Sequence, residues 1–408
     1  MDTAAHRVVV TGLGPVSSIG TGVRRFGAAL RRGTSGVSPI SAFDTTGFAH
    51  ANGCEVRGFR PESHIRRLDP HALGRASQFA VAAAALALRH ARVDPRQLAD
   101  RPGLVSVGTT DGESQDLDRL TETFVREGPY ALPVEVIRRV PASWISARVA
   151  QEFRLAAVEA VTLPTACAAG NYAVGYAFDV LRSGEAEFAL CGGADAMCRK
   201  TFAGFYRLGT IAPEYCQPFD ADRKGILTGE GSGMLFLETL DGARRRGARV
   251  YAEVLGYGLS CDAKHPVAPD QASIVTCMRR AHDRAGVDPA EVGLVSAHGT
   301  GTKANDLTEA AAVREVFGDS PPPTVSVKSM IGHAMGAASA LAAIACVVAL
   351  EYGFIPPTIN HRRTDPECGL DCVPNHARKA TLRVVQNNAF AFGGNNSVLM
   401  LAAPGRRS

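Results

Sequence analysis

The feature that most constrains the fold is an alternation of two kinds of segment along the chain. Residues 7–14 (RVVVTGLG) and 104–110 (LVSVGTT) have the β-branched composition of buried strands. Residues 75–90 are long and rich in alanine, as expected of a helix buried on most of its sides. This alternation is typical of proteins in which helices cover a central sheet. The sequence therefore predicts an α/β fold.

The alternating pattern occurs twice. Residues 249–258 (RVYAEVLGYG) match the first strand and its glycine turn, and residues 294–300 (LVSAHGT) resemble residues 104–109 (LVSVGT). The helix expected to begin at Cys167 likewise has a counterpart near His333. We therefore predict a duplicated α/β unit, whose reactive groups come from equivalent strand and helix ends where the two halves face each other.

The two predicted halves are unequal. The first covers residues 1–249 and contains an extra segment from about residue 116 to 159, which reads as irregular and includes Trp144 and Phe153. We expect this insertion to pack against a partner subunit. The second half covers residues 250–408.

Composition narrows the possible classes of protein. The 408 residues are 46% hydrophobic and 21% charged, which suits a large globular core. A net charge of +4 is too weak to indicate a nucleic-acid binder. The ten cysteines include no C-x-x-C pair, so the chain has no zinc-ribbon pattern, and a chain of this length needs no disulfide scaffold.

Two segments bear on membrane association. The first seven residues lack the charged and apolar regions of a signal peptide. Residues 330–350 approach membrane length but contain His333 and Ser339 and are rich in glycine and alanine, which favours a buried helix. We expect a cytoplasmic protein with no membrane partner.

Cys167 is the candidate nucleophile. It precedes two alanines and a glycine in the segment 165–170 (TACAAG), at an expected helix start. Unpaired N–H groups and the positive end of a helix dipole favour a thiolate, so we expect a lowered cysteine pKa. The alternative, a small buried cysteine, explains most of the other nine.

Two histidines complete the candidate site. His298 ends an apolar strand and is followed by Thr300 and Thr302, whose hydroxyls suit a site that binds amides or hydroxyls of an extended ligand. His333 is expected at a helix start, where the dipole favours a neutral imidazole that can donate a hydrogen bond to an oxyanion. A core histidine and a zinc ligand are the alternatives, but no H-E-x-x-H pattern is present, and we expect no metal.

Two further segments accompany the histidines. Lys328 lies in an apolar stretch near His333, where a buried ammonium needs an acidic partner, and Glu309 is the candidate; an ordinary surface ion pair is the alternative. Residues 388–396 (NAFAFGGNN) read either as a core strand with a turn or as a mobile loop. In the loop interpretation, a backbone N–H completes an oxyanion site while Phe392 gates access.

Taken in order, these segments resemble the β-ketoacyl-[acyl carrier protein] synthases of the thiolase superfamily, in the elongating branch that uses one cysteine and two histidines. The resemblance also covers residues 218–223 (PFDADR) and 229–233 (GEGSG) and extends over nearly the whole chain. It implies a thiolase-like fold in which a duplicated α/β unit forms five α-β-α-β-α layers. It also implies decarboxylative condensation of an acyl chain with malonyl-acyl carrier protein in a type II polyketide or fatty-acid pathway.

The resemblance assigns a role to each candidate residue. Cys167 accepts the acyl chain, and His298 and His333 support decarboxylation of the malonyl unit. Thr300 and Thr302 contact the pantetheine arm, and Lys328 paired with Glu309 orders the histidines. The N–H groups of Cys167 and Phe392 form the oxyanion hole. No cofactor of its own is implied, since phosphopantetheine arrives on the carrier protein.

The chain also departs from the family pattern. Ala168 and Ala169 stand where the family often has Ser or Thr, Gln217 stands for a frequent Arg, and Asn395 for a frequent Thr. Asp111 occupies a position that is usually apolar and often borders the acyl pocket. We hypothesise that the pocket accepts a polar, short or unsaturated chain.

Partners and competing functions remain to be distinguished. The implied partners are an acyl carrier protein and a second subunit, in a homodimer or in a heterodimer with a chain-length-factor-like protein. A non-catalytic partner subunit typically lacks the cysteine, thiolases use a Cys-His-Cys set, and the starter-using branch has Asn where His333 stands. Five basic residues have two interpretations: a patch that docks the acidic carrier protein, or scattered surface charge. They are Arg66, Arg67, Arg199, Lys200 and Arg207.

Overall fold

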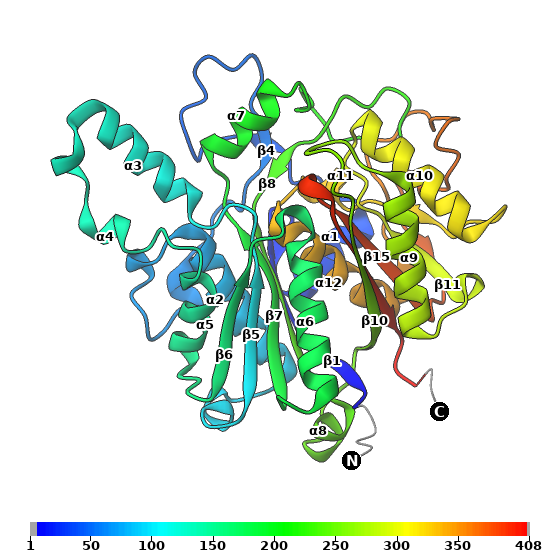
Figure 1. The fold of residues 1–408 in the computed structure, drawn as a ribbon, viewed down its shortest axis with the longest axis horizontal. Coiled ribbons are helices and arrows are strands. Elements are labelled where there is room, and N and C mark those ends of the chain that lie inside the picture. The colour runs from blue at the N-terminus through cyan, green and yellow to red at the C-terminus, as the bar shows by residue number, and fades with distance from the viewer. Residues whose placement is uncertain (1–5, 406–408) are drawn as a thin grey trace.

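The computed structural model describes residues 6–405 and is built around one continuous hydrogen-bonded sheet (Figure 1). From one edge to the other its strands are β12 (Thr324–Val325), β11 (Val292–Ser296), β15 (Val384–Phe390), β16 (Asn395–Ala402), β10 (Ala252–Cys261), β1 (Val8–Ser17), β9 (Gly231–Thr239), β7 (Phe188–Asp195), β5 (Gly103–Gly108) and β6 (Val158–Leu163).

This order contains the same five-stranded arrangement twice. In the first half, β6, β5 and β7 are parallel, and β9 and β1 follow antiparallel. In the second, β12, β11 and β15 are parallel, and β16 and β10 follow antiparallel. The halves join where β1 pairs with β10. β1 thus corresponds to β10 and β5 to β11, as the internal repeat predicts, whereas the boundary at residue 249 stays a prediction.

Helices complete five layers, which confirms the fold class. One outer face is covered by α2 (Arg75–Ala91) and α5 (Trp144–Phe153), and the other by α9 (Gln271–Ala285) and α10 (Lys303–Phe317). Between the half-sheets lie α6 (Ala169–Ser183) and α12 (Gly336–Tyr352), near the centre of Figure 1. The remaining longer helices and short strands are α1 (Val23–Arg32), α3 (Ser114–Glu127), α4 (Val134–Ile137), α7 (Arg199–Arg207), α8 (Leu240–Arg245), α11 (Lys328–Ile331), β2 (Gly20–Thr21), β3 (Ser38–Pro39), β4 (Asn52–Cys54), β8 (Thr228–Gly229), β13 (Phe354–Ile355) and β14 (Arg378–Lys379).

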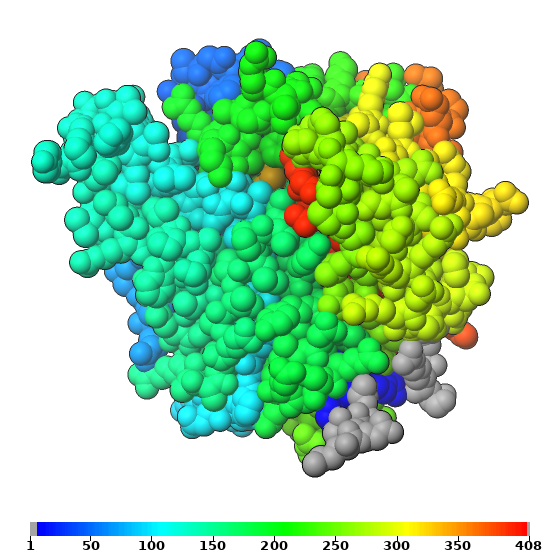
Figure 2. Space-filling view, viewed as in Figure 1, coloured from blue at the N-terminus to red at the C-terminus, as the bar shows by residue number. Residues whose placement is uncertain are grey.

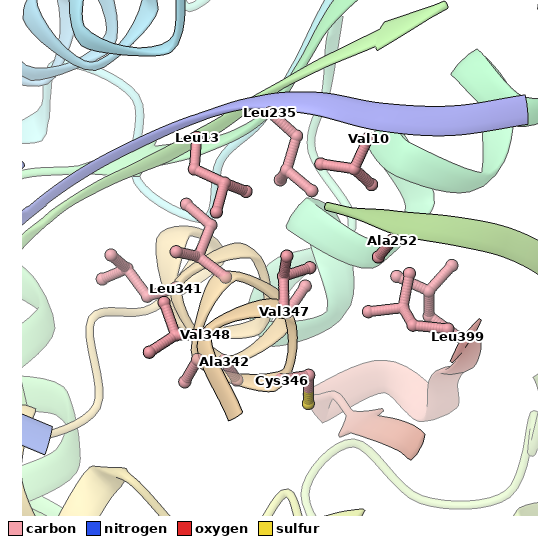
Figure 3. Packing of buried hydrophobic residues seen from close by; sticks show 14 of the residues in the cluster. Val10, Leu13, Leu235, Ala252, Leu341, Ala342, Cys346, Val347, Val348 and Leu399 are labelled. Carbon is pink, nitrogen blue, oxygen red and sulfur yellow. The ribbon is translucent and has the colours of Figure 1, made fainter. Parts of the chain in front are cut away.

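The central helix α12 is apolar on every side because it is covered on every side. Its residues from Gly336 to Ala349 are all buried. In Figure 3, Leu341 and Val347 lie beneath Leu13 and Leu235 of the first half-sheet. Small side chains let the helix approach its neighbours closely, so the apolar stretch that approaches membrane length is a core helix. Within residues 6–405 the structure contains no helix that meets the length and hydropathy needed to cross a bilayer.

The prediction of an irregular segment at residues 116–159 was wrong. The structure forms α3, α4, α5 and β6 there. Leu117, Leu120 and Phe124 have the spacing of an apolar helix stripe, so the helical pattern was present in the sequence. Of these three side chains the structure buries only Leu120. In Figure 1 α3 and α4 project from the body as an arm.

Candidate active site

The structure brings the predicted thiol and both imidazoles together. One ligand atom from each of Cys167, His298 and His333 lies within 4.8 Å of the other two, and the three residues line a single cavity. All three side chains are buried. They come from the ends of α6, β11 and α11, which belong to different halves of the molecule. The duplicated fold therefore assembles the site at the junction that the repeat predicted.

Cys167 lies in a short 3-10 helix, Ala166–Ala168, that leads directly into α6. Burial raises the pKa of its thiol to about 11, although Lys328 and the backbone N–H of Phe392 act in the opposite direction. The expected lowering of the pKa was therefore wrong. Helix-end N–H groups offset only part of the cost of placing a thiolate where water is excluded. The resting thiol is neutral at pH 7 and needs a proton acceptor when it reacts.

His298 is held with a defined tautomer. Its Nδ1 lies 3.4 Å from Nζ of Lys328, which also donates to the His298 carbonyl oxygen at 2.5 Å. An ammonium group only donates, so Nδ1 accepts and Nε2 carries the proton. Burial lowers the pKa of His298 well below its usual value, and the neighbouring Lys328 lowers it further. The imidazole is therefore a neutral donor.

His333 is also a neutral imidazole with its proton on Nε2, but a different contact fixes this tautomer. It lies in the connection between α11 and α12, three residues before Gly336 begins α12, so it does not start the helix as expected. Its Nδ1 accepts the backbone N–H of Met335 at 3.1 Å, which leaves the proton on Nε2. Burial, followed by Lys328, lowers the pKa of His333 well below its usual value. The neutral imidazole is thus fixed by one local hydrogen bond.

Lys328 and Glu309 are both buried, which favours the expected buried ammonium with Glu309 as its acidic partner over a surface ion pair. Among residues 6–405 no ion pair within 4.0 Å joins them, although each carries a charge that the other stabilises. Glu309 accepts the N–H groups of His298 at 2.8 Å and Gly299 at 2.7 Å. Lys328 holds the His298 carbonyl oxygen. The two charged groups thus fix the same peptide segment from its N–H and C=O sides.

The cavity wall contains the remaining predicted ligands. Thr300 and Thr302 line it, with their hydroxyl oxygens 2.9 Å apart. Phe392 begins the turn Phe392–Gly394 and is 37% exposed at the cavity. Its N–H lies against the sulfur of Cys167, and its ring centroid lies 5.4 Å from that of Phe205. The backbone of Phe392 therefore faces the Cys167 sulfur, and its ring lies in the wall of the cavity beside Phe205.

Asp111 lies outside this cavity lining. Its Oδ1 forms an ion pair with Lys200 at 2.9 Å and accepts the Thr201 hydroxyl at 2.6 Å, and its side chain is only 4% exposed. Its Oδ2 is buried without a hydrogen-bond partner in the described part of the chain. Asp111 also raises the pKa of Cys167, though less than burial does, so the two lie within electrostatic reach.

The five basic residues of the predicted docking patch fall into two groups. Arg66 and Arg67 lie in a groove whose other basic members are Arg89, Arg96 and Arg154. Their backbone N–H groups are held by Glu152. On α7, Lys200 is engaged by Asp111, while Arg207 is exposed and precedes Leu208, which lines the cavity. Only the α7 group therefore borders the site.

Several cavity residues escaped the sequence interpretation. Phe205 comes from α7 and Leu208 follows the end of that helix, while Val267, Ala268 and Pro269 come from the loop after β10. They are separated in sequence from every reactive residue and share no motif with it. Figure 2 shows the C-terminal residues of the site between the two halves of the molecule, where this cavity opens.

Cys167, His298 and His333 also have the donor types of a zinc site. Their neighbours place the proton on Nε2 of each imidazole, which suits donation of a hydrogen bond to an oxygen atom. The arrangement can therefore offer two neutral N–H donors beside a nucleophilic sulfur, in a site from which most water is excluded.

Comparisons with known proteins agree with this chemistry. Residues 5–243 match the profile of the "Beta-ketoacyl synthase, N-terminal domain" and residues 251–362 that of the "Beta-ketoacyl synthase, C-terminal domain". "Nodulation protein E" of a Rhizobium species is 37% identical over 402 residues, covering 97% of this chain and 98% of that protein. "3-oxoacyl-[acyl-carrier-protein] synthase 2" of Synechocystis is 36% identical over 405 residues, covering 96% and 97%.

Solved structures are similar over the same length. "The ishigamide ketosynthase/chain length factor" has a chain that is 56% identical, with a TM-score of 0.97 over 98% of this chain and 100% of that chain. A type II PKS acyl-carrier protein in complex with its ketosynthase bound to the hexaketide has a chain that is 30% identical, with a TM-score of 0.90 over 98% and 99%. This chain therefore belongs to the β-ketoacyl synthase family and is an acyltransferase of the β-ketoacyl-[acyl carrier protein] synthase class.

Proposed function

We propose that this chain is the condensing subunit of a type II polyketide synthase and extends a cysteine-bound acyl chain with malonyl-acyl carrier protein. The observation that carries the proposal is the convergence of the Cys167 sulfur with two imidazoles, all within 4.8 Å, in one buried cavity. A thiol alone would suit many enzymes. Two neutral N–H donors beside it suit a reaction that develops negative charge on a thioester oxygen.

The first half-reaction transfers the acyl group. The Cys167 sulfur attacks the thioester carbonyl of the acyl carrier, a C–S bond forms to Cys167, and the bond to the pantetheine sulfur breaks. Because burial keeps Cys167 protonated until it reacts, the thiol proton passes to the departing pantetheine sulfur, which leaves as a thiol. The N–H groups of Cys167 and Phe392 stabilise the oxyanion.

The second half-reaction forms the carbon–carbon bond. His298 and His333 donate from Nε2 to the thioester oxygen of the malonyl unit while its carboxylate leaves as carbon dioxide. The electron pair of the broken C–C bond becomes the enolate, which attacks the carbonyl carbon of the Cys167 thioester. The C–S bond breaks, and the released Cys167 thiolate takes up a proton from water to restore the neutral thiol. Decarboxylation generates the carbanion in place, so no strong base is needed. Thr300 and Thr302 hold the pantetheine arm, and the enzyme works in the cytoplasm.

The partner subunit that we propose is a chain-length-factor-like protein. Strand β6 ends the sheet and its residues are only partly buried. The adjoining arm exposes apolar side chains unusual for a protein surface, namely Leu117, Phe124, Val125, Tyr130, Val134 and Ile137. A ketosynthase/chain length factor structure contains a chain 56% identical to this one, which supports a heterodimer over a homodimer. Light scattering of the isolated chain should give a monomer, and a stable homodimer would contradict this assignment.

The acyl substrate is a polar, short or unsaturated chain in this proposal. Support comes from Asp111, which lies outside the cavity lining but within electrostatic reach of Cys167, and whose buried Oδ2 has no hydrogen-bond partner among residues 6–405. The decisive experiment measures the intact mass of the protein after incubation with a panel of acyl carriers. We expect an adduct that is absent in Cys167→Ala and forms fastest with polar or unsaturated chains. No adduct from any carrier would refute the function, and a preference for long saturated chains would refute the role of Asp111.

Carrier docking is tested separately. We propose that the carrier binds the basic residues of α7, namely Arg199, Lys200 and Arg207, of which Arg207 lies beside the cavity-lining Leu208, and that Arg66 and Arg67 in their separate groove are the second candidate group. Charge reversal in Arg207→Glu and in the double variant Arg66→Glu/Arg67→Glu should each raise KM for the acyl carrier without changing alkylation of Cys167 by iodoacetamide. A residue whose reversal leaves KM unchanged is not part of the patch.

A further inference from the structure

A buried chain of side-chain hydrogen bonds connects the outer helix α9 with Glu309. Nε2 of His282 lies 2.6 Å from Oε1 of Gln386, and Nε2 of Gln386 donates to Oδ1 of Asn388 at 2.8 Å. Nδ2 of Asn388 then donates to Oε1 of Glu309 at 3.0 Å. His282 is 4% exposed, and the other three residues are 1% exposed or less.

The direction of this chain follows from its last member. A carboxylate only accepts hydrogen bonds, so the Asn388 amide must turn its nitrogen toward Glu309 and its oxygen toward Gln386. Gln386 must then turn its oxygen toward His282, whose Nε2 carries the proton. Every donor points toward Glu309. A chain ordered in this way has one arrangement, because reversing any member leaves two acceptors or two donors facing each other.

Strand β15 carries the two middle members, and its alternation explains their placement. Gln386 and Asn388 are two residues apart and face the outer layer, where α9 and α10 lie. Asn387, between them, faces the inner layer and donates to Asn171 of α6 and to the carbonyl oxygen of Ser339. Burying three consecutive side-chain amides on one strand costs folding free energy unless each side chain is hydrogen-bonded. The hydrogen bonds of Gln386 and Asn388 therefore help to hold β15 in place.

We propose that His282, Gln386 and Asn388 are positioning residues that act on His298 through Glu309. Oε1 of Glu309 accepts both from Asn388 and from the backbone N–H of His298, while Oε2 accepts the N–H of Gly299. Asn388 is the closer of two side-chain amides that fix the rotation of the carboxylate, the other being Asn305 at 3.5 Å from Oε2, and the carboxylate in turn holds the peptide that carries the His298 imidazole. The inference rests on the proposed role of His298 in decarboxylation.

The test separates the histidine-dependent step from the reactivity of Cys167. Release of carbon dioxide from malonyl-acyl carrier protein reports on His298, and the rate of alkylation by iodoacetamide reports on the accessibility and reactivity of the thiol. His282→Leu removes the first donor, whereas His282→Gln keeps a donor that reaches Gln386. Thr276→Ala on the exposed face of the same helix is the matched control.

We expect His282→Leu to lower decarboxylation about threefold to tenfold and His282→Gln to restore it, with alkylation of Cys167 unchanged in both. Asn388→Leu, which removes the hydrogen bond to the charged Glu309, should lower decarboxylation by about 10-fold to 100-fold. Unchanged decarboxylation in His282→Leu and Asn388→Leu, or a parallel fall in decarboxylation and alkylation, would overturn the inference. Wild-type protein that releases no carbon dioxide would instead refute the proposed function.

Discussion

The close crossing of α6 and α12 gives the most direct test of how packing serves the site. Gly170 lies one residue into α6, and a Cβ added there would lie 2.7 Å from the backbone nitrogen and 2.8 Å from the Cβ of Ala340 on α12. Unstrained carbon contacts are about 3.5–4.0 Å, so the two helices would have to separate by about 0.7–1 Å. Overpacking of this kind costs about 1–3 kcal/mol.

Separating α6 from α12 should also increase the distance between the reacting atoms. Cys167 lies two residues before α6 begins and His333 three residues before α12 begins, so moving the helices apart moves the thiol from the imidazole. A misplacement of about 1 Å can cost about 100-fold in rate. A loss of about 1–3 kcal/mol from the folding free energy leaves most of the protein folded and so lowers the condensation rate little by itself. Gly170→Ala should therefore lower the condensation rate mainly by displacing the reacting atoms.

The assay compares condensation rate and urea unfolding for Gly170→Ala with those for Gly204→Ala. Gly204 lies in α7, and a Cβ added to it would meet no heavy atom within 4 Å. The control should keep its condensation rate and gain up to about 1 kcal/mol, because alanine has the better helix propensity. Wild-type condensation by Gly170→Ala would refute the argument that this crossing sets the geometry of the site.

Three further predictions concern charge. Because burial raises the pKa of Cys167 to about 11, its alkylation by iodoacetamide should accelerate about tenfold per pH unit between pH 7 and 10, and a plateau below pH 8 would contradict this. Glu152→Ala, which leaves the N–H groups of Arg66 and Arg67 without their acceptor, should lower the free energy of unfolding by about 1–3 kcal/mol in urea titrations. The hydrogen bond from Arg223 lowers the pKa of Asp365, so the stabilisation of the fold by this pair is present above about pH 4 and is lost as the pH falls through the lowered pKa. In Asp365→Asn, the Tm should therefore fall less steeply with pH below about pH 4 than in the wild type. An unchanged dependence of Tm on pH would argue against this contribution.

Much of the fold could be predicted because local pattern and tertiary role agree. The β-branched runs at residues 7–14 and 104–110 became β1 and β5, and the repeat between residues 104–109 and 294–300 became the correspondence of β5 with β11. Helix α3 was missed although Leu117, Leu120 and Phe124 have helical spacing. Only the tertiary structure shows that most of this apolar stripe lies on the surface of a projecting arm.

For the site, the identity of the residues could be predicted from sequence, whereas their charge states and contacts could not. The residues of the site were readable from sequence, because thiol, imidazole and glycine-rich turns occur in short segments around Cys167, His298 and His333. Their charge states were not. The expected lowering of the Cys167 pKa counted the local helix end but not burial of the thiol. Lys328 and Glu309 form no direct ion pair, and each instead makes a hydrogen bond to the backbone of His298.

The sequence by itself determined the α/β class, the duplicated unit and the identity of the reacting groups, since these depend on residue types in short segments, whereas the five-layer order followed from the family resemblance. Only the tertiary structure decided which imidazole nitrogen carries the proton, where Asp111 points, and how His282 reaches Glu309. Those properties depend on distances of about 3 Å between residues as much as 104 positions apart, and no local pattern encodes such distances.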